Sequence, residues 1–295
     1  MRATVLALSI VAACTRESAR NAGNPGTADV PSLPAVAAPP AQPSLDSIAS
    51  RLAAFDEQVD STRAQLRLHA STPAADSSFV KFRETYLALA DTLSSQLGEV
   101  SVGGAVGATP GGEDSLLAML RRHGFDVTQS EGQSYVDEDV GHLLAVFGPL
   151  LTPAMREYLK IRDTEQDTRF SEDAGLMISW DSLSDRIAVW ERFLQAYPTF
   201  SWRAAPEAWR DTYLATYLTG MDNTRTLSDS GTLRPEVRAS YERFLHTYSE
   251  IPAAQVIRDF LALLAEDSVP DATNVEQFLR GHHLESMLGV QPPVR

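Results

Sequence analysis

The sequence predicts an all-α protein, with an N-terminal helical hairpin followed by a multi-helix bundle or a short α-solenoid-like array. Two observations predict this class. From residue 44 onward, apolar residues recur every three or four positions over most of the chain, the spacing of one face of an α-helix. In addition, prolines stand where helices are expected to begin, because proline fits the first turn of a helix: Pro153, Pro206, Pro235 and Pro252.

The first 13 residues have the features of a signal peptide. Arg2 is followed by an apolar run, Ala3 to Ala13, that is too short to cross a bilayer as a helix. The single cysteine of the chain, Cys14, comes directly after this run. We therefore expect residues 1–13 to be removed from the mature protein. We also expect Cys14 to have a function at this position.

The four residues Val11-Ala12-Ala13-Cys14 resemble the lipobox of bacterial lipoproteins. The resemblance implies cleavage before Cys14, lipid on its sulfur and on its new amino group, and stable anchoring, since two or more acyl chains hold a protein on a membrane. Thr15 in the second mature position implies the outer membrane of a two-membrane bacterium, facing the periplasm. The alternative is an ordinary signal peptide that ends on a cysteine by chance.

The amino-acid composition limits the classes of partner that the protein is expected to bind. The net charge of −14 disfavours nucleic acid and anionic lipid. A lipidated Cys14 leaves no cysteine for a disulfide, so packing must stabilise the fold, and 43% hydrophobic residues suffice for one or two cores. Residues 14–43 are rich in proline, alanine and glycine and poor in large apolar residues. We expect them to be a disordered tether.

Residues 44–100 are predicted to form a helical hairpin. In the first helix the apolar face follows a 3-4 spacing, and Pro73 is expected to end the segment: Leu45, Ile48, Leu52, Phe55, Val59, Thr62, Leu66 and His69. A second helix is expected to start near Asp76, with one apolar face: Phe79, Phe82, Tyr86, Leu89, Leu93 and either Leu97 or Val100. Residues 101–112 are glycine-rich and predict a linker between two domains.

The second domain is predicted to span 113–290. A short helix should run to about His123, where Gly124 stops it, and residues 125–139 break the helical period, which suits a small hairpin or an ordered loop. Helices are expected at 138–148 and 153–171, the second capped by Thr152. About five more helices should lie between 181 and 288, with Asp181 and Thr273 as further starting points.

Two segments of this domain repeat each other. Ala188–Pro198 (AVWERFLQAYP) and Ala239–Ser249 (ASYERFLHTYS) align at a shift of 51 residues, which predicts a repeated helix pair at 181–219 and 235–266. The motif resembles divergent tetratricopeptide units of bacterial envelope lipoproteins, including those that help to assemble outer-membrane proteins. The period departs from the family's 34 residues. The resemblance implies a protein-binding helical array; the alternative is two related helices in an ordinary bundle.

No catalytic motif is found, and neither a metal nor a cofactor is predicted. H-E-x-x-H and G-x-S-x-G are both absent. The candidate binding residues lie in and beside residues 131–139, where acidic and aromatic side chains gather outside a regular helix, as at many functional loops: Glu131, Tyr135, Asp137, Asp139 and His142. The alternative is an acidic turn in which Asp137 or Asp139 caps the next helix.

These observations predict a lipid-anchored cell-envelope protein that acts in protein interaction or scaffolding. Its expected partners are the membrane, through lipidated Cys14, and other envelope proteins, with no nucleic acid. The alternative function is a cell-wall-directed hydrolase or carbohydrate-binding protein that uses the acidic loop. That function predicts a cleft in which Glu131, Tyr135 and Asp137 face Trp180 or Trp202.

Overall fold

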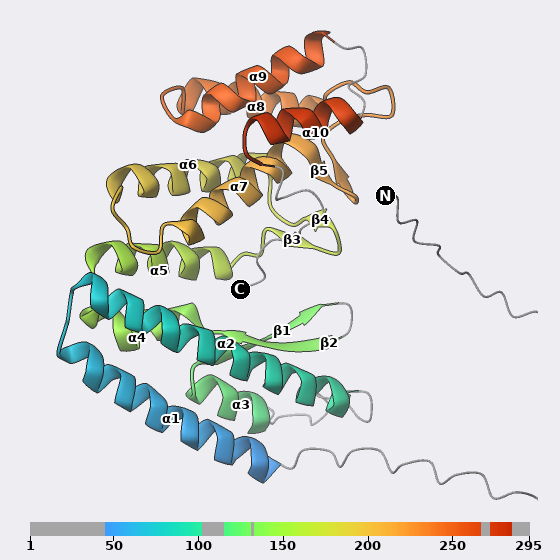
Figure 1. Ribbon diagram of the computed structural model, residues 1–295. Helices are drawn as coiled ribbons and strands as arrows, with labels where there is room; N and C mark the ends of the chain where they lie inside the picture. The colour runs from blue at the N-terminus through green and yellow to red at the C-terminus, as the bar shows by residue number, and fades with distance from the viewer. Residues whose placement is uncertain (1–44, 102–114, 131–132, 267–271, 285–295) are drawn as a thin grey trace, which may run out of the picture. The chain divides into compact units, whose positions relative to one another are not determined.

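A computed structural model of the chain describes residues 45–101, 115–130, 133–266 and 272–284. The described residues form ten α-helices, one short 3-10 helix and three two-stranded antiparallel sheets (Figure 1). The prediction of a mostly helical protein is confirmed, and the three small sheets are the departure from an all-α fold. The signal peptide, Cys14, the tether and nearly all of the glycine-rich linker lie outside the described residues.

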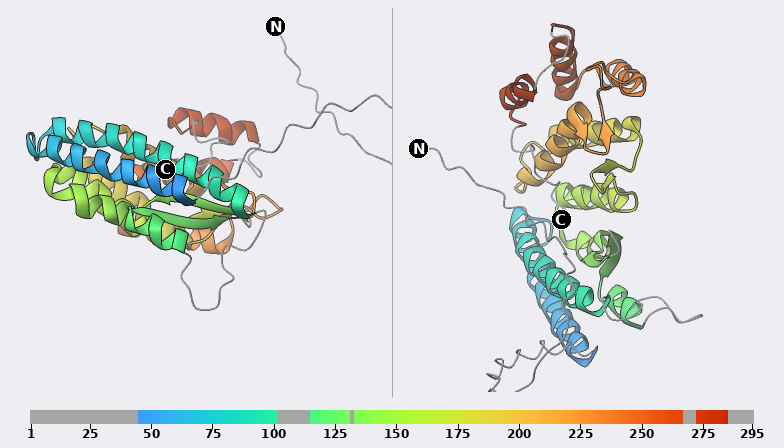
Figure 2. Two further views of the ribbon diagram at one scale, coloured as in Figure 1. Left: turned by 90° about the horizontal axis from the view of Figure 1, so that it is seen from below. Right: turned by 90° about the vertical axis from the view of Figure 1, so that its right-hand side faces the viewer.

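Helices α1 (Leu45–Arg67) and α2 (Pro73–Ser101) pack against each other as predicted (Figure 2). Two details of the prediction are wrong. Because α1 ends at Arg67, His69 lies in an exposed turn and not on the helical seam. Pro73 is the first residue of α2 and does not end a helix, since its missing N–H is not needed there. The buried faces carry the predicted residues Ile48, Leu52, Phe55, Leu66, Phe79, Phe82, Tyr86 and Leu93.

Helix α3 (Ser115–Arg122) leads into a hairpin of strands β1 (Phe125–Ser130) and β2 (Gln133–Glu138). Gly124 separates helix from strand with a φ of +80°, as its predicted stop position requires. Helix α2 runs along β2, where the Ser94 hydroxyl accepts from the N–H of Val136 at 2.8 Å and donates to its carbonyl at 3.1 Å. Elements on both sides of the predicted linker therefore contribute to one hydrophobic core.

Helix α4 (Val140–Phe147), the 3-10 helix η1 (Gly148–Leu150) and helix α5 (Pro153–Gln166) follow. The Thr152 hydroxyl caps α5 as predicted, accepting from the N–H of Met155. The buried carboxylate of Asp76 in turn accepts from the Thr152 N–H at 3.0 Å and its hydroxyl at 2.6 Å. Asp76 thus holds the start of α5 against the first turn of α2.

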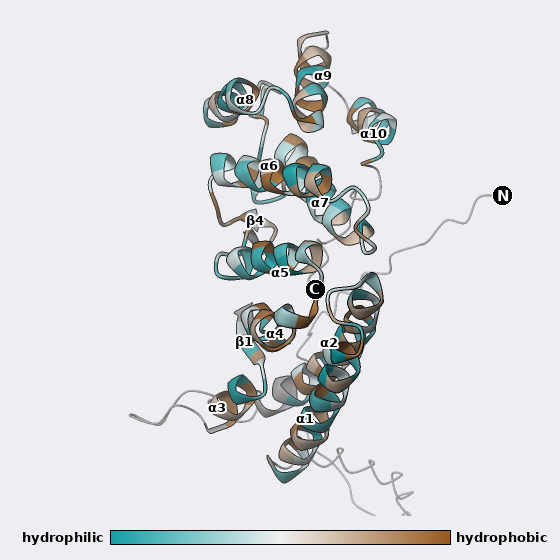
Figure 3. Cartoon of the chain, turned by 90° about the vertical axis from the view of Figure 1, so that its left-hand side faces the viewer, coloured by the Kyte–Doolittle hydropathy of each residue, from teal (hydrophilic) through white to brown (hydrophobic). Residues whose placement is uncertain are grey.

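The rest of the chain contains two further hairpins and five helices. The predicted helix pairs at 181–219 and 235–266 are present as α6–α7 and α8–α9. The elements in order are β3 (Ser171–Glu172), β4 (Gly175–Leu176), α6 (Trp180–Ala196), α7 (Ala204–Thr219), β5 (Gly220–Met221), β6 (Thr224–Arg225), α8 (Pro235–Thr247), α9 (Pro252–Glu266) and α10 (Ala272–Gly281). Helices α6 to α10 carry both hydrophobic and hydrophilic residues (Figure 3).

Each helix pair follows a β-hairpin, and this arrangement occurs three times. The units are β1–β2 with α4–α5, β3–β4 with α6–α7, and β5–β6 with α8–α9. The sequence alignment detected the repeat of the second and third helix pairs. Both helices of the first pair were predicted, at 138–148 and 153–171, but were not assigned to the repeat, and the opening helix α4 is only 8 residues long. The sequence analysis missed the hairpins of the later units, so the helix predicted over 153–171 ends five residues early, at Gln166.

The second and third hairpins meet at their turns. Asp173 and Ala174 both have positive φ, +46° and +50°, in the turn of β3–β4. The Asn223 backbone N–H donates to the Ala174 carbonyl at 2.9 Å, and its side-chain amide donates to the Asp173 carbonyl at 2.5 Å. These bonds join neighbouring units and fix the left-handed turn.

Candidate functional site

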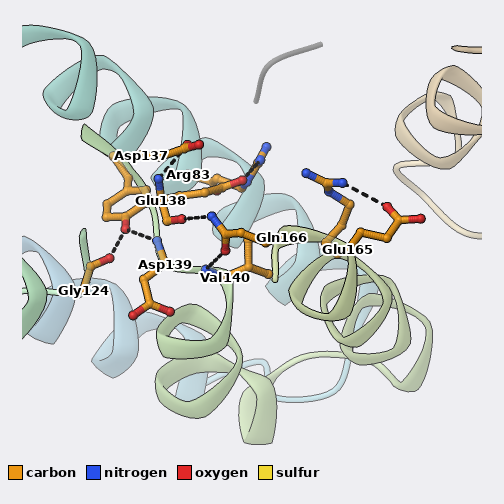
Figure 4. Close-up of polar contacts among 10 residues, drawn as sticks. Arg83, Gly124, Asp137, Glu138, Asp139, Val140, Glu165 and Gln166 are labelled. Carbon is orange, nitrogen blue, oxygen red and sulfur yellow. Dashed lines mark hydrogen bonds and ion pairs between the residues drawn. The ribbon is translucent and has the colours of Figure 1, made fainter. Parts of the chain in front are cut away.

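Within the predicted acidic segment, residues Gln133–Glu138 form strand β2, and Asp139 directly precedes α4 (Figure 4). Side chains alternate along the strand, so Tyr135 and Asp137 share one face while Val136 and Glu138 share the other. Tyr135 is 39% exposed, whereas Glu138 is 2% exposed. Glu131 lies outside the described residues. Tyr135 and Asp137 therefore lie on the same face of β2. The next two acidic residues, Glu138 and Asp139, make different internal contacts.

Glu138 forms a buried, two-point ion pair with Arg83 of α2. The Arg83 Nε donates to Glu138 Oε2 at 2.6 Å, and its Nη2 donates to Oε1. Burial lowers the pKa of Arg83, but the charge and hydrogen bonds of Glu138 outweigh it, so the pKa is raised. The Trp202 ring lies 5.4 Å from the guanidinium carbon, which adds a cation–π contact. Neither Arg83 nor Glu138 is among the predicted binding residues. Their pairing could not be predicted from local sequence, because they are 55 positions apart.

Asp139 is the N-cap of α4. Its carboxylate accepts from the backbone N–H of His142 at 2.7 Å, and its own N–H donates to the Tyr86 hydroxyl at 3.0 Å. The capping alternative of the sequence analysis is therefore confirmed for Asp139. The His142 ring packs over Gly124, where an added Cβ would lie 2.4 Å from the ring. The Asp139 carboxylate therefore contacts the backbone of His142, while the His142 ring packs over Gly124.

Gln166 closes the junction between β2 and α4 from the end of α5. Its side-chain amide donates to the Glu138 carbonyl, and its Oε1 accepts from the Val140 N–H at 3.0 Å. The Tyr86 hydroxyl donates to the Gly124 carbonyl on the other side (Figure 4). The backbone from Glu138 to Val140 is thus held by side chains from two helices, which makes this junction rigid.

The pKa of the Asp137 carboxyl is raised toward neutral pH. Its carboxylate is partly buried and accepts from the N–H of Glu138 at 2.8 Å. Burial raises its pKa from 3.8 to about 6; the charge of Glu138 raises it as well, while Arg162 lowers it. Asp126 lies directly opposite on β1, and like charges in that position repel each other. Asp137 could therefore exchange a proton near neutral pH.

Another buried carboxylate, Glu165 of α5, lies in a separate polar cluster. It accepts from the Trp190 indole at 2.9 Å, from the Tyr213 hydroxyl at 3.0 Å and from Arg162 at 3.0 Å. Burial raises the pKa of Glu165, and the positive charge of Arg162 opposes that rise. The Arg162 guanidinium stacks 3.7 Å from the Trp209 ring centre. This cluster ties α5 to α6 and α7.

The sequence analysis expected either Trp180 or Trp202 at the acidic segment. The Trp202 ring contacts Arg83, the partner of Glu138. Trp180 begins α6 and packs against Tyr217, with ring centres 6.2 Å apart. Trp202 is therefore the tryptophan that lies beside the Arg83–Glu138 pair. Within the described ranges, no group of three or more histidine, cysteine or acidic side chains is placed to hold a metal ion.

Comparison with known proteins finds that no family model, no curated protein and no solved structure matches the chain. None of the helices in the described part of the chain has both the length and the apolar character needed to span a membrane.

Proposed function

We propose that this chain is a lipid-anchored protein of the bacterial cell envelope that binds other envelope proteins through its helical repeats. The observation that carries the proposal is the threefold succession of a hairpin and a helix pair. Units of this kind can stack into a short α-solenoid-like array, and such arrays present extended surfaces to partner proteins. The weak likeness of the α6 and α8 motifs to tetratricopeptide units agrees with that role.

The internal contacts of two acidic residues in the candidate segment weigh against catalysis by those side chains. Glu138 is paired with Arg83, and Asp139 caps α4. Side chains that complete internal contacts are not available to a substrate. We test the proposal by placing photoreactive amino acids at exposed positions on several faces of the chain in cells. Envelope proteins should be crosslinked from at least one face, and repeated failure at every face would remove the interaction function.

The anchoring part of the proposal rests on Cys14 and the three residues before it. The Cys14→Ser variant should lose its acyl groups and leave the membrane fraction, because no thiol remains for lipid attachment. Mass spectrometry of the N-terminal peptide and cell fractionation measure this, with Ser18→Ala as a control that keeps the cysteine. A Cys14→Ser protein that stays on the membrane, beside a wild type without lipid, would contradict the proposal.

One observation favours the alternative, a cell-wall-directed hydrolase or carbohydrate-binding protein. The pKa of Asp137, near 6, suits a general acid at neutral pH. If the chain cleaves cell-wall glycan, Asp137→Asn should abolish the release of soluble fragments from purified cell wall, and Glu84→Gln on the exposed side of α2 should not. Equal release by wild type, both variants and a buffer blank would remove the hydrolase.

A further inference from the structure

Two hollows flank helix α6. The first, of about 220 Å³, lies between the starts of α6 and α8, and its lining residues are Ser179, Trp180, Asp181, Glu236, Ala239 and Ser240. The second, of about 300 Å³, lies between α5 and α6, and its apolar wall consists of Ile161, Val189, Phe193, Ala196 and Tyr197. Neither hollow involves the β1–β2 hairpin, so both are distinct from the acidic segment.

Both hollows open on the exposed side of α6. Asp181, Val189 and Ala196 are exposed, while Ile187 and Trp190 between them are buried in the core. Asp181 and Val189 are eight residues apart, which corresponds to about 12 Å along a helix. A single bound segment could therefore reach both hollows, using about four residues as a strand or eight as a helix.

The first hollow has the chemistry of a cation site. Its lining contains the Trp180 ring and the carboxylates of Asp181 and Glu236, and no basic residue. Arg243 approaches Asp181 only to 3.9 Å, since its closer ion pair, at 2.8 Å, is with Asp185. Among the described residues, Glu236 forms no ion pair. An aromatic ring beside carboxylates attracts a guanidinium or ammonium group.

The second hollow is suited to an apolar side chain. Val189 is 38% exposed, although large hydrophobic residues are mostly buried in the described part of the chain. Phe193 and Ile161 form the neighbouring walls. Arg192 also lines this hollow, and its guanidinium carbon lies 5.1 Å from the centre of the Tyr248 ring at the end of α8.

We propose that this face of α6, flanked by α5 and α8, binds a basic segment of a partner protein. An arginine or lysine side chain enters the hollow at Trp180 and Glu236, and a nearby leucine or phenylalanine enters the hollow at Val189. The net charge of −14 favours such a partner at long range. The proposal rests on the proposed interaction function and names its surface and the chemistry of its partner.

A peptide titration tests the proposed surface. The probes are 12-residue peptides in a serine and glycine background, with one arginine and one leucine at varied separations, and matched peptides with citrulline for arginine. The indole N–H resonance of Trp180, assigned with Trp180→Phe, reports binding by NMR. We expect arginine peptides to shift this resonance and to bind about tenfold more tightly than citrulline peptides, because citrulline has no charge.

Matched variants locate the two hollows. Glu236→Gln and Val189→Glu should each weaken peptide binding about tenfold. Glu84→Gln on α2 and Leu68→Glu in the α1–α2 turn make the same changes at other exposed positions and should leave binding unchanged. Thermal unfolding by circular dichroism shows that each variant is folded. Equal affinity for arginine and citrulline peptides, or equal effects of site and control variants, would overturn the proposal.

Crosslinking in cells separates this surface from the general interaction function. A photoreactive residue at position 189 should capture a protein, and the capture should decline with Glu236→Gln. If positions 68 and 84 capture proteins while position 189 captures none, the α6 surface is wrong and the interaction function stands. If no position captures a protein, the interaction function itself fails.

Discussion

The first repeat unit and the two later units share one architecture but have different polar contacts in their interiors. The first unit contributes Glu138 to an ion pair with Arg83 of the preceding helix α2, and this pair is buried between α2 and the β1–β2 hairpin. In the later units, the buried polar groups include hydroxyls, such as the Tyr217 and Ser240 pair at 2.8 Å, and the carboxylate of Glu191, while the ion pair of Arg243 with Asp185 is more exposed. The difference predicts that losing the arginine of an ion pair is far more damaging for the buried Arg83–Glu138 pair than for the Arg243–Asp185 pair.

The largest effect should come from removing a buried charge. Arg83→Met leaves the Glu138 carboxylate unpaired in the core, and breaking such a pair costs about 3–5 kcal/mol of unfolding free energy. Arg243→Met breaks a half-exposed pair and should cost about 1 kcal/mol or less. Urea unfolding measures both.

The double variant Arg83→Met with Glu138→Leu serves as the control for this comparison. It removes both charges and should recover much of the lost stability, because no unpaired carboxylate remains. If Arg83→Met and Arg243→Met cost the same, the contrast between the units is wrong.

The next effect concerns the glycine that joins α3 to the first hairpin. Gly124→Ala places a Cβ at a φ of +80° and 2.4 Å from the His142 ring, so we expect a loss of about 2–3 kcal/mol. Gly281→Ala is the control, because an added Cβ there meets nothing within 4 Å, and it should cost less than about 0.5 kcal/mol.

A second background separates the two causes at Gly124. In a His142→Ala chain the ring is absent, so Gly124→Ala should cost only the backbone term, roughly 1–2 kcal/mol. An unchanged cost would show that His142 does not pack as described.

A smaller effect, at Asp137 of the first unit, depends on pH. The pKa of Asp137 is about 6 when folded and higher than its ordinary 3.8, so the folded chain holds this proton more tightly than the unfolded chain. Its contribution to stability is therefore complete below about pH 4 and is lost as the pH rises through 6. Asp137→Asn should be more stable than wild type at pH 7 by roughly 1–2 kcal/mol, with the difference vanishing near pH 4.

Denaturant unfolding at pH 4 and pH 7 measures this change. The control is Asp222→Asn, in the exposed turn of the third hairpin, where little solvation is lost on folding. A pH-independent effect of Asp137→Asn would show that the burial of this carboxyl has no energetic consequence.

The sequence was informative where a local pattern decides the structure. The spacing of Ile48, Leu52 and Phe55 predicted α1, and Thr152 with Pro153 predicted the start of α5, because caps and helical faces act within a few residues. The β3–β4 and β5–β6 hairpins were missed, since strands of two residues have no period to detect.

The contacts of the candidate segment could be predicted only in part, because some of them join residues that are far apart in the sequence. Its acidic composition was visible, and so was the capping role of Asp139. The pairing of Glu138 with Arg83 was not, because it depends on how α2 lies along β2. An arginine in the apolar stripe of α2 was the available signal, as a charge at a buried position needs a partner.

The smallest of the site effects lies at the joint between the later units, where uncharged groups of Asn223 make the contact. Asn223→Ala removes one hydrogen bond to Asp173 and should cost about 1 kcal/mol, against about 3–5 kcal/mol for Arg83→Met. Ala174→Gly at the same joint should instead be neutral or slightly stabilising, because glycine adopts the φ of +50° without strain. Hydrogen exchange should show the loss in Asn223→Ala confined to the turns of β3–β4 and β5–β6. A loss as large as that of Arg83→Met would mean that the later units also depend on a single polar contact, and the two regions would then be held together in the same way.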